Sequence, residues 1–313
     1  MIPTQKEVIE AQKRVSPHIH NTPVLRSSSL DKMVDAQIHF KCENFQRMGA
    51  FKYRGAVNAL LQLSKEQLSR GVITHSSGNF AAALSLAART LGTKAIIVMP
   101  SNVNRVKLQA VEAYGGSIVT CEPTLEAREK TTRAWMESTG ATLLHPSNQR
   151  EVILGNATAA LELTKQAEAL DVVLAPVGGG GLLAGTALAC TYVDHNMEII
   201  GAEPFGADDA YLSLKTGKIQ PSVHPRTMAD GLRTQLGDQN FPIIQKFVSR
   251  IIRVEESEIA AAMRLVWERM KIIIEPSSAV AVAALLREKK EFEKRRIGVI
   301  LSGGNVDLDD LPF

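Results

Sequence analysis

Short runs of aliphatic and β-branched residues recur along the chain, and most are followed by a segment with helical spacing of its apolar residues. Eight such runs predict strands: 38–43, 71–75, 94–100, 116–121, 171–177, 197–204, 250–255 and 296–304. Several are nearly continuous Val, Ile and Leu, which is typical of strands that helices cover on both faces.

Helices are predicted between these strands. Apolar residues recur at three- and four-residue intervals in the segments 81–92, 104–115, 125–140 and 257–270. Three of these segments end at a glycine, which commonly stops a helix: Gly92, Gly115 and Gly140. The alternation of strands and helices predicts an α/β protein with largely parallel sheets.

The length of the chain, 313 residues, favours two domains. No linker rich in proline or serine separates them, so the chain is expected to cross between domains within ordinary connections. Ligands commonly bind at the junction of two such domains.

Composition narrows the class of protein. Apolar residues make up 45% and charged residues 22%, values that exclude disorder, collagen and coiled coil. A net charge of +3 gives no indication of nucleic acid or of an anionic membrane as a partner. The three cysteines, Cys42, Cys121 and Cys190, are far apart and form no CxxC pair, which indicates a reducing compartment and neither a disulfide framework nor a zinc ribbon.

Two segments bear on the location of the protein. Residues 1–15 lack the basic head and apolar run of a secretory signal. Residues 172–193 carry no charge over the length of a membrane span, but Pro176 and the run of glycines interrupt them. We therefore expect strand, turn and helix there, and a soluble protein of the cytoplasm.

The run of four glycines at 178–181 follows a buried strand and precedes a helix. Glycines allow the backbone to approach an anion closely, and the free N–H groups of a helix start point at it, so a phosphate site is predicted. Gly179, Gly181 and Ala184 also satisfy the looser dinucleotide pattern GxGxxA, with Glu198 or Glu203 near the ribose position. A dinucleotide fold usually begins with this unit, whereas here the unit lies past the middle of the chain.

A second loop, THSSGNFAAALSLAA at 74–88, also follows a strand and opens a helix. Ser76 or Ser77 suits the N-cap, and the amides near Gly78 and Asn79 can receive a carboxylate. Two hydroxyls, a glycine and an asparagine together exceed what a cap requires.

Two further loops complete the candidate chemistry. Lys52 stands at the start of an amphipathic helix, where a lone lysine is by default a surface residue; in a cleft, desolvation would instead lower its pKa and make a neutral amine available for imine formation. Ser302 presents a hydroxyl at the end of a buried strand. A phosphate cradle, an imine-forming lysine, a carboxylate-binding helix start and this hydroxyl are the parts of a pyridoxal phosphate site that acts on an amino acid.

The motifs in combination resemble one enzyme family. The segments NTPVLRSSSL, FKCENFQRMGAFKYRGA, THSSGN, AIIVMP, PVGGGGLLAG, AEPFGADDAY, VWERMKIIIEPSSAV and LSGGNVDL span nearly the whole chain. They resemble the fold type II pyridoxal phosphate enzymes, specifically the serine racemase and serine/threonine dehydratase group. The resemblance implies the tryptophan synthase β-like fold: a large cofactor-binding domain of residues 1–68 and 150–313, and a small mobile domain of residues 69–149.

The resemblance also implies roles for individual residues. Lys52 would bind the cofactor covalently and take the Cα proton, with Phe51 beside the ring, Asn79 at the ring hydroxyl and Ser302 at the pyridine nitrogen. Ser76 would bind the substrate carboxylate, and Ser77 would return a proton on the opposite face. The remaining implied residues are the phosphate-binding Gly178, Gly179, Gly180 and Gly181 and the substrate-binding Arg128.

A divalent cation and a homodimer are further implications of the resemblance. Glu203, the carbonyl of Ala207 and Asp209 match the family's cation site, whose hard oxygen ligands suit magnesium, calcium or manganese. The sequence departs from the family pattern at Ala50, at Phe80 and in GNAT at 155–158. None of these departures removes a catalytic group.

The expected reaction is elimination of water from L-serine, L-threonine or 3-hydroxyaspartate, giving a 2-oxo acid and ammonia, with racemisation of serine on the same site. Three alternatives remain at this point: an enzyme that is primarily a serine racemase, a dinucleotide-dependent dehydrogenase, and a non-catalytic protein that binds pyridoxal phosphate and an amino acid. The dehydrogenase would leave Lys52 and Ser302 unexplained.

Overall fold

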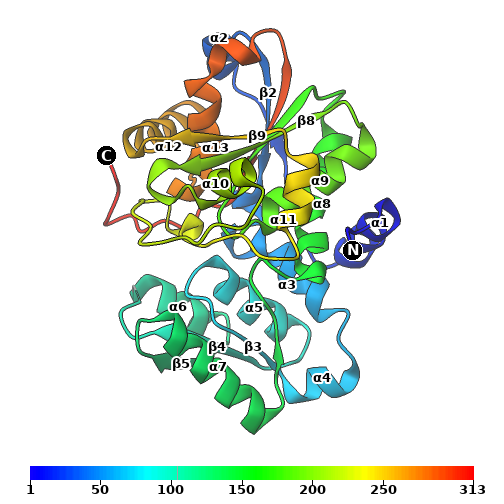
Figure 1. Ribbon diagram of the computed structural model, residues 1–313, viewed down its shortest axis with the longest axis vertical. Helices are drawn as coiled ribbons and strands as arrows, with labels where there is room; N and C mark the ends of the chain where they lie inside the picture. The colour runs from blue at the N-terminus through cyan, green and yellow to red at the C-terminus, as the bar shows by residue number, and fades with distance from the viewer. Residues whose placement is uncertain (104) are drawn as a thin grey trace.

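The fold contains two separate sheets (Figure 1). The computed structural model describes residues 1–103 and 105–313, with only the backbone of Val106 and Leu125. The large sheet has the strand order β1-β2-β10-β7-β8-β9, and all its neighbouring pairs are parallel except β1 with β2. The small sheet has the order β5-β4-β3-β6 and is wholly parallel. The predicted α/β fold with two largely parallel sheets is confirmed.

The strands of the large sheet are β1 (Val24–Leu25), β2 (Gln37–Cys42), β7 (Val172–Pro176), β8 (Glu198–Pro204), β9 (Arg250–Val254) and β10 (Arg296–Leu301). Those of the small sheet are β3 (Val72–Thr74), β4 (Ala95–Pro100), β5 (Ser117–Cys121) and β6 (Thr142–Leu143). The small sheet therefore lies in the chain between β2 and β7.

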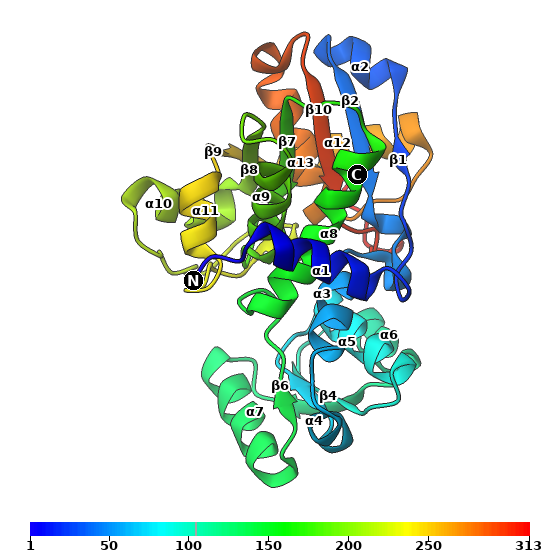
Figure 2. The same ribbon diagram turned by 90° about the vertical axis from the view of Figure 1, so that its right-hand side faces the viewer.

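Helices cover both faces of the large sheet, and Figure 2 views it from the side of α8. Side chains of β7 alternate between two cores, so that Val173 and Ala175 face α8 and α9 while Val172 and Leu174 face α12 and α13. The helices outside the small sheet are α1 (Gln5–Val15), α2 (Ser28–Val34), α3 (Lys52–Leu60), α8 (Arg150–Gln166), α9 (Gly181–Val193), α10 (Asp209–Thr216), α11 (Phe241–Phe247), α12 (Glu256–Met270) and α13 (Pro276–Arg287).

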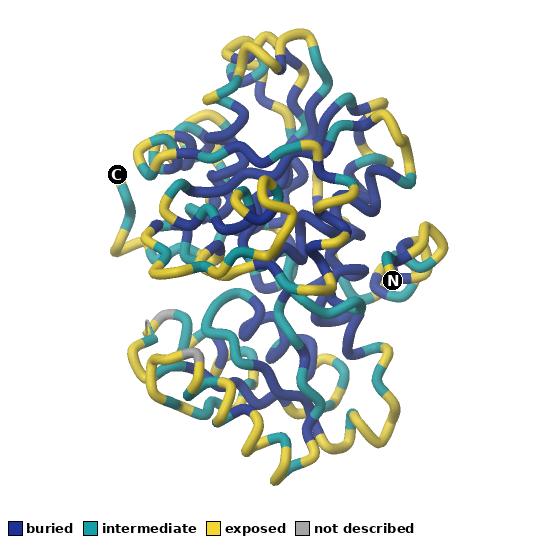
Figure 3. Tube along the Cα trace, viewed as in Figure 1, coloured by how far each residue is buried: buried dark blue, intermediate teal, exposed yellow. Residues whose placement is uncertain are grey.

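The small sheet has its own buried interior, visible below the large sheet in Figure 3. Ile97 and Met99 of β4 face a core shared with α3 and α5, whereas Ile96 and Val98 face the side of α7. The helices around this sheet are α4 (Lys65–Arg70), α5 (Asn79–Thr90), α6 (Arg105–Ala113) and α7 (Leu125–Thr139).

The local predictions are confirmed only in part. All eight predicted strands are present, but the two-residue strands β1 and β6 were missed. Gly140 is the left-handed C-cap of α7, while Gly92 and Gly115 take positive φ two residues beyond the ends of α5 and α6. Asn104, the first residue of the predicted helix 104–115, lies outside the described residues.

The uncharged segment 172–193 forms strand β7, the glycine turn and α9, as predicted. Among residues 1–103 and 105–313, no helix has the length and apolar character needed to cross a membrane.

A cluster of buried ionic side chains holds α3 to α8. The guanidinium of Arg54, on α3, donates to both Glu43 oxygens at 2.6 and 2.8 Å and to both Glu162 oxygens at 2.8 and 2.7 Å. Lys41 donates to Glu162 at 2.7 Å, and all of these side chains are buried. Because each charge has several partners, the cluster fixes the position of α3, which begins at Lys52.

The backbones of α3 and α8 also touch. A Cβ atom at Gly155 would lie 2.5 Å from the carbonyl oxygen of Arg54 and 2.7 Å from the Cα of Gly55. Only glycine permits this approach, so α3 is attached to α8 by close backbone contact as well as by the ion cluster.

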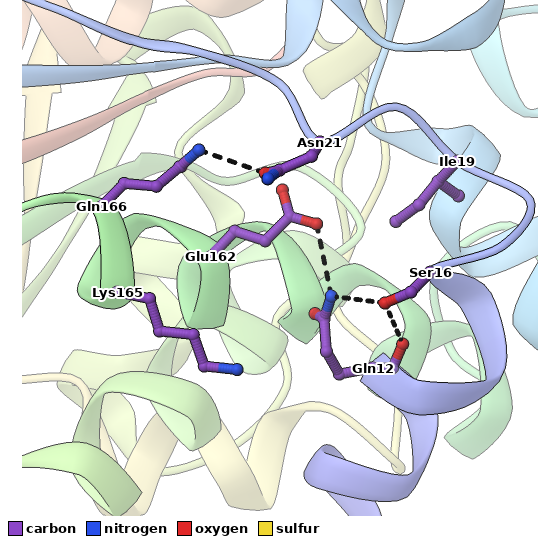
Figure 4. Close-up of a pocket in the computed structure, with 7 residues that line it drawn as sticks. All are labelled: Gln12, Ser16, Ile19, Asn21, Glu162, Lys165 and Gln166. Atoms are coloured by element: carbon purple, nitrogen blue, oxygen red, sulfur yellow. Dashed lines mark hydrogen bonds between the residues drawn. The ribbon is translucent and has the colours of Figure 1, made fainter.

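A surface pocket of about 320 Å³ lies beside the same cluster, between α1 and α8 (Figure 4). It contains none of the predicted site residues, and Glu162, on its inner side, already binds Arg54 and Lys41. The pocket is lined by Gln12, Ser16, Ile19, Asn21, Glu162, Lys165 and Gln166.

Removing the central cation of the cluster should destabilise the fold. In Arg54→Met, Glu43 loses its cation and stays buried, so we expect a loss of about 3–5 kcal/mol in the free energy of unfolding, measured by urea titration. Arg264→Gln, which breaks the exposed Arg264–Glu268 pair, is the control and should change stability by less than about 0.5 kcal/mol. Equal effects of the two substitutions would contradict this account of the cluster.

Candidate active site

The segment before α3 is paired with the end of β10. The N–H of Phe51 donates to the carbonyl of Ser302 at 3.0 Å, and Ala50 forms an isolated bridge with Gly303. Ser302 is only 3% exposed. This pairing places Lys52, the first residue of α3, one residue along the chain from the contact with Ser302, whose hydroxyl is predicted to lie in the site.

The amine of Lys52 lies in apolar surroundings with one carbonyl partner. Its Nζ donates to the carbonyl oxygen of Pro146 at 2.8 Å and lies 5.0 Å from the ring centre of Phe51 and 6.0 Å from that of Phe80. Burial lowers the pKa of Lys52 to about 8, although the carboxylate of Glu275 acts in the opposite direction. A substantial fraction of the amine is therefore neutral near physiological pH.

The four glycines form a turn in which side chains have no room. A Cβ atom would lie 2.6 Å from the Cα of Leu232 if placed at Gly178, 2.4 Å from Ser147 Oγ at Gly179, and 2.8 Å from the Ser147 carbonyl at Gly181. Gly180 has a φ of +78° and is the N-cap of α9.

The amides of this turn are available to a ligand. Within the part of the chain that the structure describes, no acceptor is found for the N–H groups of Gly179, Gly180 and Gly181. Unpaired amides at a helix start attract anions, so the turn fits a phosphate group.

Ser147 connects the glycine turn to Lys52. It follows Pro146, which accepts the hydrogen bond from Lys52, and it packs against the positions of Gly179 and Gly181. The buried amide of Asn240 donates to the carbonyls of Gly179, at 2.8 Å, and Ser147, at 3.3 Å. The amine and the turn thus contact consecutive residues of one loop, and no sequence motif indicated that Asn240 braces it.

The start of α5 differs from the predicted cap. Neither Ser76 nor Ser77 is the N-cap: that position belongs to Gly78, no side chain caps the helix, and α5 begins at Asn79. Ser76 Oγ accepts from the N–H of Gly78 at 3.5 Å. The prediction of a serine cap was wrong, and both hydroxyls lie half-buried in the loop before the helix.

Asn79 forms three hydrogen bonds to residues of other elements. Its Nδ2 donates to Glu275 Oε1 at 2.9 Å and Oε2 at 3.1 Å, and its Oδ1 accepts from Asn305 Nδ2 at 2.8 Å. Glu275 was present in the motif that carries the family resemblance but was not singled out as a site residue.

Arg128 and two histidines lie near the loop before α5. Arg128 is half-buried on α7. The pKa of His75 is lowered, first by burial and also by the charge of Arg128.

The rings of His75 and His145 meet edge to face at 5.7 Å, and His145 Nδ1 accepts the N–H groups of Ser147 and Asn148 at 3.2 and 2.8 Å. Burial, followed by the charges of His75 and Lys52, lowers the pKa of His145 to about 4.

The predicted cation ligands come from the end of β8 and from the turn and helix that follow it. Glu203 is fully buried near the end of β8, where its oxygens accept the N–H groups of Ala210 and Tyr211 at 3.0 and 2.8 Å. Asp209 is 3% exposed, and both its oxygens lack a partner in the described structure. Ala207, in the short helix Phe205–Ala207, is also buried.

Burial raises the pKa of Glu203 well above its usual value and that of Asp209 to about 6. Two buried carboxylates, one of them without hydrogen-bond partners, fit a hard cation. Across residues 1–103 and 105–313, no set of three or more His, Cys, Asp or Glu side chains is arranged to hold a metal. A cation at this place would therefore need the Ala207 carbonyl and water as further ligands.

Comparison with known proteins identifies the family. The model of the pyridoxal-phosphate dependent enzymes matches residues 15–303. The chain belongs to this enzyme family. It is 47% identical over 312 residues to the serine racemase of Dictyostelium discoideum, covering 98% of this chain and 96% of the relative. It is 45% identical to the beta-hydroxyaspartate dehydratase of Paracoccus denitrificans (strain Pd 1222), covering 100% and 99%.

A solved structure agrees with this assignment. The serine racemase of maize superposes with a TM-score of 0.97 at 43% identity, covering 99% of this chain and 95% of that one. The predicted membership of the fold type II group that contains serine racemases and serine/threonine dehydratases is confirmed. The chain is thus a pyridoxal phosphate-dependent enzyme, which excludes the dinucleotide-dependent dehydrogenase.

The glycine turn allows a matched test of the phosphate cradle. Gly180→Ala places a methyl group 2.6 Å from Leu236 at positive φ, so we expect at least a tenfold loss of pyridoxal phosphate affinity in fluorescence titrations of the apoprotein. Gly92→Ala also has positive φ, at +72°, but meets open space. It should cost about 1–2 kcal/mol in stability from the left-handed backbone and leave cofactor affinity unchanged. If both variants bound the cofactor equally well, the assignment of the cradle would fail.

Proposed function

We propose that this enzyme eliminates water from a hydroxy amino acid and releases a 2-oxo acid and ammonia, and that it racemises serine on the same site. Substrates of the elimination are L-serine, L-threonine and 3-hydroxyaspartate. The water lost in the elimination is matched by the water consumed when the nitrogen is released as ammonia. The observation that carries the proposal is the half-buried Lys52, whose amine has a lowered pKa and contacts the loop that packs on a turn of unpaired amides.

The proposed reaction assigns a role to the glycine turn, to Lys52 and to the start of α5. When bound, pyridoxal phosphate supplies an electron sink for the negative charge that develops at the substrate Cα. The glycine turn holds the phosphate, and Lys52, once free as a neutral amine, takes the Cα proton. Ser76 and the amides at the start of α5 bind the substrate carboxylate.

Ser302 and Ser77 decide between the two reactions. Ser302 is a neutral hydroxyl, which stabilises a protonated pyridine less than a carboxylate would, so charge delocalisation is modest and early loss of the β-hydroxyl is favoured. Ser77 returns a proton to the opposite face of Cα in racemisation. An enzyme that is primarily a serine racemase is the second candidate, and the 47% identity to a serine racemase supports it.

The half-buried Arg128 supports 3-hydroxyaspartate as a substrate. Its guanidinium has no carboxylate partner within 4 Å among the described residues, so it is available to a second substrate carboxylate. The 45% identity to a beta-hydroxyaspartate dehydratase supports the same substrate.

We propose in addition that residues 69–149 form a small mobile domain that excludes water from the site when it closes, and that residues 1–68 and 150–313 form the large one. Ser76, Ser77 and Arg128 would move with the small domain. A homodimer in the cytoplasm and a structural divalent cation at Glu203, Ala207 and Asp209 complete the proposal.

A substrate panel tests the function. The purified enzyme should be yellow, sodium borohydride should fix the cofactor to Lys52, and L-serine, L-threonine or 3-hydroxyaspartate should yield a 2-oxo acid and ammonia. Arg128→Met should lower kcat/KM for 3-hydroxyaspartate at least tenfold more than for serine, because only the former has a second carboxylate.

Ser77→Ala is the matched variant for the second reaction. It should abolish interconversion of L- and D-serine, measured by chiral chromatography, and retain elimination from L-serine. Racemisation that survives this substitution would remove Ser77 from its role. A protein that binds the cofactor at Lys52 and converts none of the panel would favour a non-catalytic amino-acid-binding protein.

The proposed cation site predicts that the order of stability of the wild type and Asp209→Asn reverses when a divalent cation is added. In EDTA, Asp209→Asn should be at least as stable as the wild type, because it removes a buried carboxylate without partners. With magnesium, calcium or manganese at a hundred times its Kd, the wild type should gain ~2.7 kcal/mol and the variant little, measured by thermal unfolding. A wild type that no cation stabilises would refute the site.

A further inference from the structure

The amide of Asn79 links the small sheet to the large one. Asn79 is the first residue of α5, whereas its partners Glu275 and Asn305 come from the turn before α13 and the turn after β10. Three hydrogen bonds of 2.8–3.1 Å join these side chains. The orientation of this amide determines whether Asn79 offers a donor or an acceptor to its surroundings.

A chain of obligatory donors and acceptors sets that orientation. Asn305 Nδ2 donates to the carbonyl oxygen of Met48 at 2.8 Å, and a carbonyl can only accept. The same nitrogen also donates to Asn79, so the atom of Asn79 that faces it must be the oxygen. The nitrogen of Asn79 therefore faces Glu275, which accepts it with both carboxylate oxygens.

This arrangement leaves one N–H of Asn79 available. The two N–H bonds of an amide diverge, so a single N–H serves both oxygens of one carboxylate. The second N–H of Asn79 is then free to donate to an acceptor in the site.

Glu275 is a buried carboxylate that packs tightly. It is 5% exposed, and a Cβ atom at Gly303 would lie 2.7 Å from its Oε1. No lysine, arginine or histidine lies within 4 Å of it among the described residues. A buried carboxylate without an ion pair is unfavourable for stability, which points to a role other than stabilising the fold.

We propose that Glu275 is a positioning residue, which orients the Asn79 amide so that its free N–H donates to the ring oxygen of bound pyridoxal phosphate. The inference rests on the proposed placement of Asn79 at the cofactor ring. The inference goes beyond the placement of Asn79 because it identifies Glu275 as the group that makes the Asn79 amide a hydrogen-bond donor toward the cofactor.

Protonation of Glu275 makes the orientation of the Asn79 amide depend on pH. Burial, with a smaller contribution from the charge of Asp230, raises the pKa of Glu275 to about 7, although the Asn79 hydrogen bond and the charge of Lys107 act to lower it. Lys52 is the other cation that interacts with Glu275. Above pH 7 the ionised carboxylate only accepts. Below it, the protonated carboxyl can donate to an amide oxygen, so the donor orientation of Asn79 loses its support.

Two substitutions separate the hydrogen bond from the charge. Glu275→Gln can still accept from Asn79 through its amide oxygen but cannot titrate, so cofactor affinity at pH 8 should stay within about threefold of the wild type. Glu275→Met fills the space without an acceptor and should weaken cofactor binding about tenfold. Affinity is measured by fluorescence titration of the apoprotein.

The decisive readout is the ratio of the cofactor dissociation constants of wild type and Glu275→Gln between pH 5.5 and 8.5. Ionisations of the cofactor itself are common to both proteins and cancel in this ratio. The ratio should rise as pH falls through about 7. A ratio that does not change with pH would overturn the proposal.

Two neighbours that do not touch Asn79 serve as controls of opposite sign. Asp230→Asn removes a repelling charge and should move the midpoint of the ratio to lower pH. Lys107→Met removes an attracting charge, which contacts Asp230, and should move the midpoint to higher pH. A purely structural Glu275 would give no such opposed shifts, and their absence would also overturn the proposal.

Borohydride reduction followed by peptide mapping distinguishes a failure of the role of Glu275 from a failure of the proposed function. Cofactor fixed to Lys52, together with a flat ratio, would reject only the role of Glu275. Cofactor that is not fixed to Lys52 in the wild type would reject the proposed function itself. Thermal unfolding at pH 8 identifies any variant that fails to fold, in which case Glu275→Gln alone carries the test, because its shape matches the native residue.

Discussion

Desolvation of the Lys52 amine is the physical constraint on which the site depends. Burial disfavours the ammonium form of Lys52, whose one hydrogen-bond partner is the carbonyl of Pro146, and its pKa falls to about 8. The amine can lie there because α3, which begins at Lys52, is held to α8 by buried ionic contacts. Arg54, two residues along the helix, binds Glu43 and Glu162, and these buried contacts fix the start of α3.

Features that repeat locally could be predicted from the sequence. Continuous Val and Ile indicate the buried strands, and the four glycines at 178–181 indicate that side chains are excluded there. Strands β1 and β6 could not be found in this way, because two residues carry no periodicity and their pairing depends on neighbours distant in the chain. The same limit explains the serine cap: a hydroxyl before a helix is a good cap only if the backbone turns toward it, and here Gly78 takes that position.

Residues that act through other residues escaped sequence reasoning. Asn240 lies 61 residues from the glycine whose carbonyl it binds, and Glu275 lies 196 residues from Asn79. A signal for Glu275 was present, since a glutamate directly before a proline at a helix start belongs to the matched motif. Its meaning needed the fold, because the same residue on a solvated helix end would simply interact with the helix dipole. His145 is a similar case, since only the structure shows two amides at its Nδ1.

The contacts of α3 indicate which groups of the site would move, and which would stay fixed, in the proposed closure of the small domain. On one side α3 is joined to α8 by the Arg54 ion cluster and by direct backbone contact at Gly55 and Gly155. On the other side it contacts α5 and shares an apolar core with it, to which Ala81 belongs. Apolar surfaces of this kind slide with little penalty, whereas a buried ion cluster keeps its geometry. Movement of the small sheet would therefore occur at the α3–α5 contact. Lys52 and the glycine turn would keep their mutual arrangement, and only the groups on the small sheet would approach the substrate.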